Sequence, residues 1–146
     1  MIDSPEINGR PPMLAGEIVE ALLSQEYWHG GELTDSFNAI FLCFNNTWHR
    51  LSFDCGIIFW RVTSTAPISF EAPELRASYR IVDLGIRLGV TSKRLARYEM
   101  RAIPDGSRVE FTFSCGQSVV FQNVDDHTTL VEWTSDAAND DTSGKK

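Results

Sequence analysis

The chain has 146 residues, of which 42% are hydrophobic, and it carries a formal net charge of -7. This length suits one domain that buries roughly 70% of its unfolded surface, and the nine Phe and four Trp exclude a disordered chain. The net acidity disfavours general binding to nucleic acid, and no run of residues reaches the ~20 apolar residues of a membrane span.

Residues 1–12 contain turn formers without hydrophobic periodicity, which predicts a flexible leader before a single domain at residues 13–134. This beginning also has acidic residues and lacks a basic segment followed by an apolar one, so we expect no secretory signal and a cytoplasmic location. Three cysteines without a Cys-x-x-Cys motif fit reduced thiols in that compartment.

An amphipathic helix is predicted after the leader, because apolar residues recur four positions apart along 14–27. The recurring residues are Leu14, Ile18, Leu22 and Ala15, Val19, Leu23. The pair Gly30-Gly31 would end this helix, since glycine adopts the left-handed conformation of a helix C-terminus.

From residue 37 onward, short aromatic and β-branched runs separated by turn residues predict strands. We expect them at 37–44, 48–54, 57–63, 78–84, 97–103, 108–114, 118–123 and 128–134. Residues 64–76, with two prolines, read as a long irregular loop. The polar residues 135–146 predict a disordered tail. The expected fold is α+β, with one N-terminal amphipathic helix packed on a curved, mostly antiparallel sheet of meandering hairpins.

Two of the predicted hairpins share a Phe-x-Cys-Gly sequence, which ends at Gly56 in the first and Gly116 in the second. A catalytic thiol needs a cation, a histidine or a helix N-terminus nearby to stabilise the thiolate. Cys55 follows Asp54, and Cys115 follows Ser114, so neither has such a neighbour in sequence. We therefore interpret Cys43, Cys55 and Cys115 as structural.

No catalytic, metal or cofactor signature appears in the sequence. The three histidines are far apart, and neither a Gly-x-Gly-x-x-Gly nor a Gly-x-Ser-x-Gly motif is present. We expect no catalytic residue, no bound metal and no cofactor, and hence a protein that is not an enzyme.

Charge is distributed unevenly, with -7 in residues 1–75, +5 in residues 76–108 and -5 in residues 109–146. The basic stretch Lys93-Arg94-Leu95-Ala96-Arg97 has few aromatic residues on which bases could stack, which favours a solvated strand face over a nucleic-acid site. The acidic segments suit a protein with a basic partner, although acidity can also serve solubility alone.

Seven residues are candidates for partner binding, because aromatic and charged side chains near turns can reach a partner. They are Trp28, Glu32, Asp35, Trp48, Asp54, Asp125 and Asp126.

The segment Trp48–Trp60, with an alternating strand, an Asp-x-Gly turn and a second strand, resembles the central hairpin of small bacterial immunity proteins. These proteins neutralise toxins of polymorphic or contact-dependent systems. The resemblance implies a non-enzymatic inhibitor that binds a toxin by presenting acidic residues to its basic site.

The leading hypothesis is therefore a cytoplasmic protein-binding module of the immunity type, whose partner is a toxin rather than a nucleic acid or a membrane. The alternative is a small-molecule-binding or enzymatic α+β barrel with a pocket lined by Phe59, Trp60 and Tyr79. A structural role through an exposed sheet edge is a third possibility.

Overall fold

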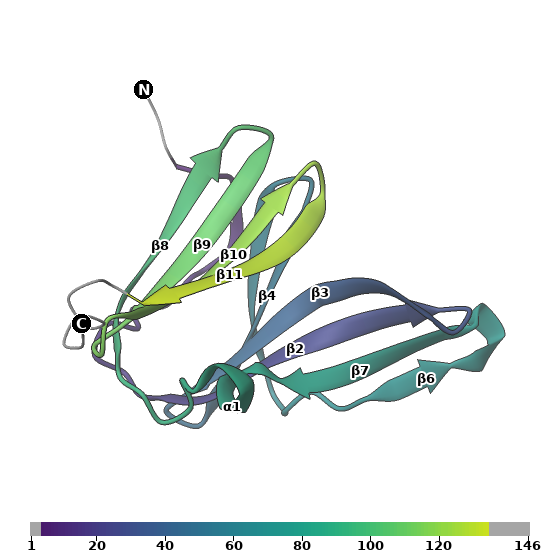
Figure 1. Ribbon diagram of the computed structural model, residues 1–146, viewed down its shortest axis with the longest axis horizontal. Coiled ribbons are helices and arrows are strands. Elements are labelled where there is room, and N and C mark those ends of the chain that lie inside the picture. Colours follow the sequence, from purple (N-terminus) through teal and green to yellow (C-terminus); the bar gives the residue numbers. More distant parts are fainter. Residues whose placement is uncertain (1–3, 135–146) are drawn as a thin grey trace, which may run out of the picture.

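Two β-sheets face each other in the computed structural model, which describes residues 4–134 (Figure 1). The large sheet has seven strands in the order β1-β5-β4-β3-β2-β7-β6, and the small sheet has four in the order β11-β10-β9-β8. The strands of the large sheet are β1 (Ile7–Gly9), β2 (Val19–His29), β3 (Glu32–Phe44), β4 (Thr47–Asp54), β5 (Ile57–Thr63), β6 (Phe70–Ala72) and β7 (Ala77–Asp83). Those of the small sheet are β8 (Leu95–Ile103), β9 (Gly106–Phe113), β10 (Gln117–Val124) and β11 (His127–Thr134).

The predicted N-terminal helix is wrong, and the α+β class with it: most of that segment forms β2, which lies between β3 and β7. Its sequence, Val-Glu-Ala-Leu-Leu-Ser-Gln-Glu-Tyr-Trp-His, suits a helix locally, but antiparallel pairing on both sides overrides that preference. Gly30 and Gly31 have φ of 60° and 85° and form the two-residue turn between β2 and β3, where we expected a helix end. The helices described are α1 (Leu84–Leu88) and a single 3-10 turn, η1 (Pro73–Leu75).

The mostly antiparallel character of the sheets is confirmed, and all eight strands expected after residue 37 are present, some of them longer than predicted. Two further strands lie where irregular chain was expected. β1 falls within the expected leader and pairs in parallel with β5, and β6 falls within the expected loop 64–76. The expected tail at 135–146 lies outside the described residues.

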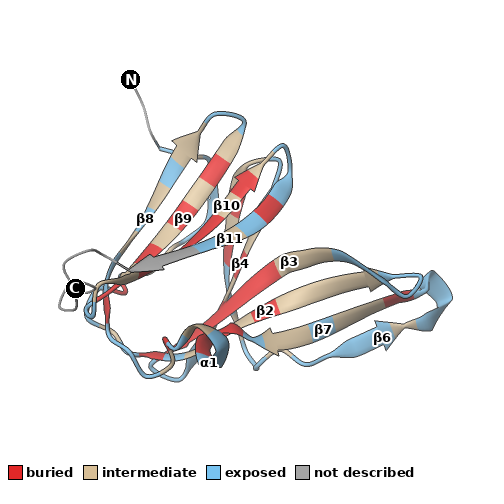
Figure 2. Cartoon of the chain, viewed as in Figure 1, coloured by how far each residue is buried: buried red, intermediate tan, exposed pale blue. Residues whose placement is uncertain are grey.

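One hydrophobic core fills the space between the sheets. It combines Leu22, Ile40, Leu51 and Trp60 from the large sheet with Phe111, Phe121 and others from the small sheet, all at most 1% exposed. Aromatic rings connect the two layers, since Trp60 contacts Tyr98 and Phe37 contacts Phe121 at ring-centroid distances of 5.6 and 6.0 Å. Figure 2 shows that buried residues concentrate where the sheets overlap.

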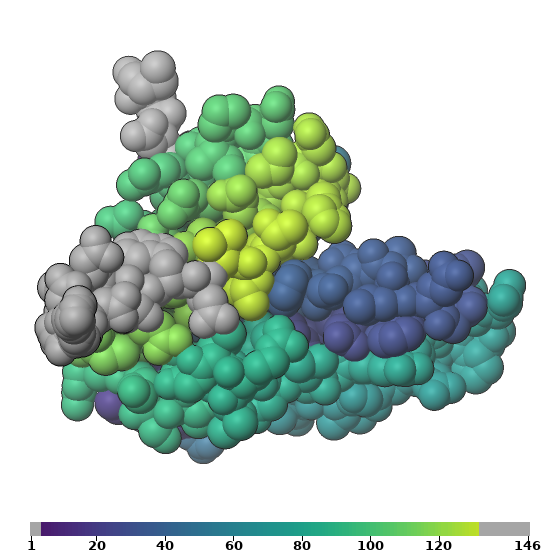
Figure 3. All heavy atoms as spheres, viewed as in Figure 1, coloured from purple at the N-terminus to yellow at the C-terminus, as the bar shows by residue number. Residues whose placement is uncertain are grey.

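The large sheet extends beyond the small one. We call the projecting part, made of residues 25–37 and 69–81 of β2, β3, β6 and β7, the arm (Figures 1 and 3). Its residues are mostly exposed or intermediate in burial. Apart from Phe37, which contacts Phe121 of the small sheet, the arm is thus a sheet that lies outside the core between the two layers.

Among the described residues, no helix is long and apolar enough to cross a membrane.

Candidate protein-binding surface

Three hairpin turns that are far apart in sequence meet at one end of the molecule. They are the β4–β5 turn with Asp54 and Cys55, the β8–β9 turn with Asp105, and the β10–β11 turn with Asp125 and Asp126. Cys55, Asp105, Asp125 and Asp126 line one open groove with a volume of about 330 Å³. The structure therefore brings together three predicted partner-binding residues, Asp54, Asp125 and Asp126. The five turn residues Asp54, Cys55, Asp105, Asp125 and Asp126 are called the acidic turn cluster from here on.

Hydrogen bonds hold the three turns in place. The carboxylate of Asp126 accepts a hydrogen bond from the backbone N–H of Cys55 at 2.8 Å, and the N–H of Asp125 donates to the carbonyl of Asp105 at 3.0 Å. The buried side chain of Asn123 accepts from the N–H of Gly56 and donates to Thr128 Oγ1, both at 3.0 Å. The bonds to Cys55 and Gly56 join the two sheets, so the fold fixes the relative positions of the turn backbones that carry the carboxylates.

The four carboxylates of the cluster are exposed, and none takes part in the ion pairs found among the described residues. The negative charge of Asp126, followed by hydrogen bonding and charge from Asp54, raises the pKa of the Cys55 thiol. Cys55 is exposed but favours the neutral thiol, because an adjacent carboxylate disfavours a thiolate.

Asp54, Cys55 and Asp126 are the described residues that could hold a metal ion, since their ligand atoms lie within 4.8 Å of one another. All three side chains are exposed. Carboxylates prefer hard cations and thiolates prefer soft ones, so this mixed set matches no one metal well.

The other predicted binding residues lie elsewhere. Trp28, Glu32 and Asp35 belong to the arm, with Glu32 directly after the β2–β3 turn. Trp28 is half-buried, since the guanidinium of Arg80 lies 4.1 Å from its ring centroid and its indole N–H donates to Glu26 at 2.9 Å. The structure does not bring these three residues to the acidic turn cluster.

Trp48 lies on the outer face of the large sheet, the face that points away from the small sheet. The register places Trp48 beside Cys43 and Thr63 on this face, while the adjacent His49 is buried and faces the core. Trp48 is half-buried and also lies apart from the acidic turn cluster.

On the outer face of the small sheet, three arginines form ion pairs with two glutamates of the same sheet. Arg97 and Arg101 form ion pairs with Glu99 at 3.9 and 3.4 Å, and Arg108 pairs with Glu110 at 3.0 Å. Arg97, from the predicted basic stretch, therefore has a carboxylate partner and lies on an exposed strand face.

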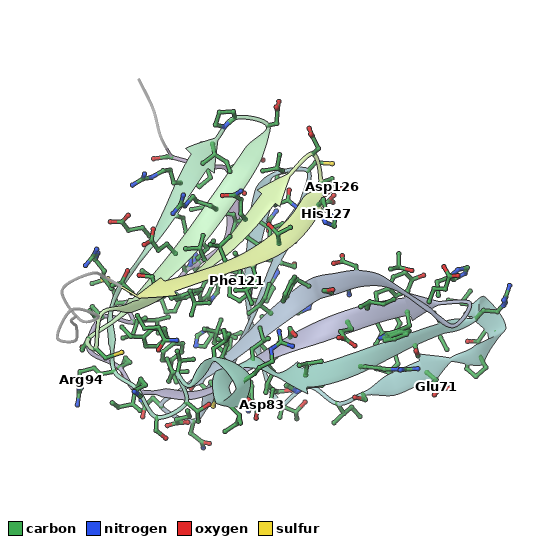
Figure 4. The ribbon with its side chains drawn as sticks, viewed as in Figure 1. Glu71, Asp83, Arg94, Phe121, Asp126 and His127 are labelled. Atoms are coloured by element: carbon green, nitrogen blue, oxygen red, sulfur yellow. The ribbon has the colours of Figure 1, made fainter. Side chains whose placement is uncertain are left out.

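The remaining cysteines lie in different environments. Cys43 is buried and its thiol donates to a carboxylate oxygen of Glu20 at 3.2 Å; burial, followed by this carboxylate, raises its pKa to about 11. Cys115 lies in the β9–β10 turn, at the opposite end of the small sheet from the β8–β9 and β10–β11 turns. The two Phe-x-Cys-Gly turns therefore lie at opposite ends of the strands. In Figure 4, Arg94, whose carbonyl accepts from the N–H of Ser114, and Asp126 mark these two ends.

The pocket residues of the alternative hypothesis are separated. Trp60 is 1% exposed in the core, while the adjacent Phe59 faces outward and Tyr79 lies in the arm, stacked on Phe70 with ring centroids 4.6 Å apart. These three side chains do not line a common pocket.

Asp105 of the cluster and Asn123, which supports it, were not predicted as binding residues. Asp105 lies between the predicted strands 97–103 and 108–114, and Asn123 is the last residue of the predicted strand 118–123. The turn sequence Pro-Asp-Gly marks Asp105, but nothing in the sequence shows that the β4–β5 hairpin of one sheet reaches the turns of the other.

Comparisons of this chain with protein-family models, with curated proteins and with solved structures found no significant match.

Proposed function

We propose that this protein is a non-enzymatic protein-binding module that presents the acidic turn cluster to a basic site on its partner. The observation that carries this proposal is the gathering of four exposed carboxylates from three turns at one end of the molecule. A fixed group of like charges without internal cations attracts a basic surface and accelerates its association.

The immunity-type inhibitor is the specific form of this proposal. Such a protein would act in the cytoplasm and cover the basic site of a toxin. The hydrogen bonds between the turns support this role, because a surface that is already ordered loses little conformational entropy when the partner binds.

The test removes charge without changing the turns. Asp105, Asp125 and Asp126 have φ of 63°, 52° and 61°, a conformation that asparagine also tolerates, so each Asp→Asn change preserves the backbone. The matched control replaces three exposed carboxylates outside the cluster, Glu6→Gln, Glu71→Gln and Glu74→Gln, with the same change in net charge.

The three proteins are compared in two measurements. Each is co-expressed with the toxin gene encoded nearest to its own gene, and growth is recorded; association with the purified toxin is then measured at several salt concentrations. We expect the Asp→Asn triple variant to lose protection and to associate about tenfold more slowly at low salt, while the control protects. Equal behaviour of the two variants would overturn the role of the cluster. Failure of the unmodified protein to protect or bind would overturn the toxin as partner.

A further inference from the structure

Two arginines face each other on the outer face of the large sheet without a carboxylate partner. Arg50 of β4 and Arg61 of β5 are directly opposite in the register. None of the ion pairs found between residues 4 and 134 includes either of them. Like charges directly opposite each other destabilise a sheet, so this pair calls for an explanation.

The small sheet shows how this chain compensates such a pair. Arg101 and Arg108 are also directly opposite, but Glu99 and Glu110, each two residues away on the same face, pair with them. The equivalent positions around the pair in the large sheet are Trp48 and Ser52 next to Arg50, and Phe59 and Thr63 next to Arg61. None of these is acidic.

The nearest carboxylate along β4 on this face is that of Asp54. It lies four residues from Arg50, about 13 Å along an extended strand, which exceeds the Debye length of about 8 Å at physiological salt. The pair is therefore not neutralised by the acidic turn cluster.

The two guanidinium groups are held differently. Arg61 donates to the carbonyl oxygens of Asn8 and Trp60 and to Asn8 Oδ1, at 2.8, 3.0 and 2.6 Å, which fixes its position at the sheet edge. Arg50 makes one long hydrogen bond, from Nη1 to Ser52 Oγ at 3.3 Å. Arg50 is half-buried on this face. Since a guanidinium has five N–H donors, the single hydrogen bond of Arg50 leaves donors without a partner among the described residues.

We propose that Arg50 and Arg61 form a binding site for a single phosphate group. Two guanidinium charges match a phosphate dianion, and the planar fork of arginine matches its oxygens. The neighbouring Phe59, over which Arg61 lies at 5.7 Å, would contact the group that carries the phosphate. A polyphosphate chain suits the site poorly, because two cations neutralise few phosphates. The acidic turn cluster at the end of the same hairpin would also repel the further phosphates of such a chain.

The experiment titrates the protein with inorganic phosphate at constant ionic strength and follows the arginine Nε–H and tryptophan indole signals by NMR. We expect saturable binding that Arg50→Gln weakens about tenfold. The matched control Arg108→Gln removes an arginine from the compensated pair and leaves phosphate binding unchanged. A parallel titration with phenyl phosphate distinguishes the source, since tighter binding than inorganic phosphate indicates an aromatic phosphate monoester and equal binding indicates free phosphate.

Stability gives the second readout. Because Arg50→Gln removes like-charge repulsion, we expect it to raise the unfolding midpoint in chloride buffer while it lowers phosphate affinity. Absence of saturable phosphate binding would overturn the proposal, as would a lowered midpoint with unchanged binding, which indicates a structural arginine. Much tighter binding of single-stranded DNA than of either phosphate compound would overturn the single-phosphate site in favour of a nucleic-acid surface.

Discussion

At the scale of single residues, Cys55 is an exposed thiol whose surroundings keep its reactivity low. The carboxylates of Asp126 and Asp54 raise the pKa of its thiol, so little thiolate is present at neutral pH. We expect Asp126→Asn to accelerate alkylation of Cys55 by iodoacetamide at pH 8, because the largest opposing charge is gone. Cys115, exposed at the other end of the small sheet, is the internal control and its rate should not change. Equal rates at Cys55 in both proteins would contradict the electrostatic explanation.

His49 is the residue at which the fold is sensitive to acid. It is 5% exposed, its Nδ1 accepts the indole N–H of Trp60 at 3.1 Å, and burial lowers its pKa from 6.5. The unfolded chain therefore takes up a proton at higher pH than the folded protein, so stability falls as the pH drops from about 6.5 to the folded pKa. His49→Asn, which offers an acceptor to Trp60 but does not titrate, should show a smaller decrease of the urea midpoint between pH 7.5 and 5. The same decrease in both proteins would exclude His49 as its source.

At the scale of elements, β1 depends on one glycine. Gly9 has φ of 120°, and a Cβ there would lie 2.0 Å from the carbonyl oxygen of Trp60 on β5. We expect Gly9→Ala to release β1 and to cost about 1–3 kcal/mol in the free energy of unfolding, with faster proteolysis of the N-terminal segment. Gly16→Ala is the control: its φ is 86°, but nothing lies within 4 Å, so only the conformational cost of about 1 kcal/mol applies. Equal losses would show that contact with β5 is unimportant.

The elements also show what the sequence can and cannot predict. Alternating residues such as Leu51 and Phe53, bounded by good turns, predicted β4 and the later strands closely, because their local pattern and their pairing agree. In β2 the local pattern and the pairing disagree. Leu22 and Leu23 fit a helix face as well as they fit a strand, and pairing with β3 and β7 on either side determines that the segment is a strand. The turns of the acidic cluster were predictable one by one, whereas their meeting depends on how the two sheets face each other.

At the scale of the whole molecule, one core makes the two sheets interdependent. Phe121 of the small sheet is fully buried and contacts Phe37 of the large sheet as well as Phe111 beside it. We expect Phe121→Ala to reduce the free energy of unfolding by about 3–5 kcal/mol. Tryptophan fluorescence, which includes Trp60 in the large sheet, and far-UV circular dichroism should follow one common transition. Two separate transitions would mean that the sheets unfold independently.

The direction of the arm is determined by irregularities in the pairing of β2 with β3. The register shifts between Gln25 and Tyr27 and again between Tyr27 and Trp28, where the long strands leave the core. Such bulges bend a strand and increase its local twist. Deleting Ser36, which lies on the arm side of the core residue Phe37, would therefore change the bend of the arm, while the core and the acidic turn cluster stayed in place. Related chains could in this way reach partners of different shape by changing the length of one bulge.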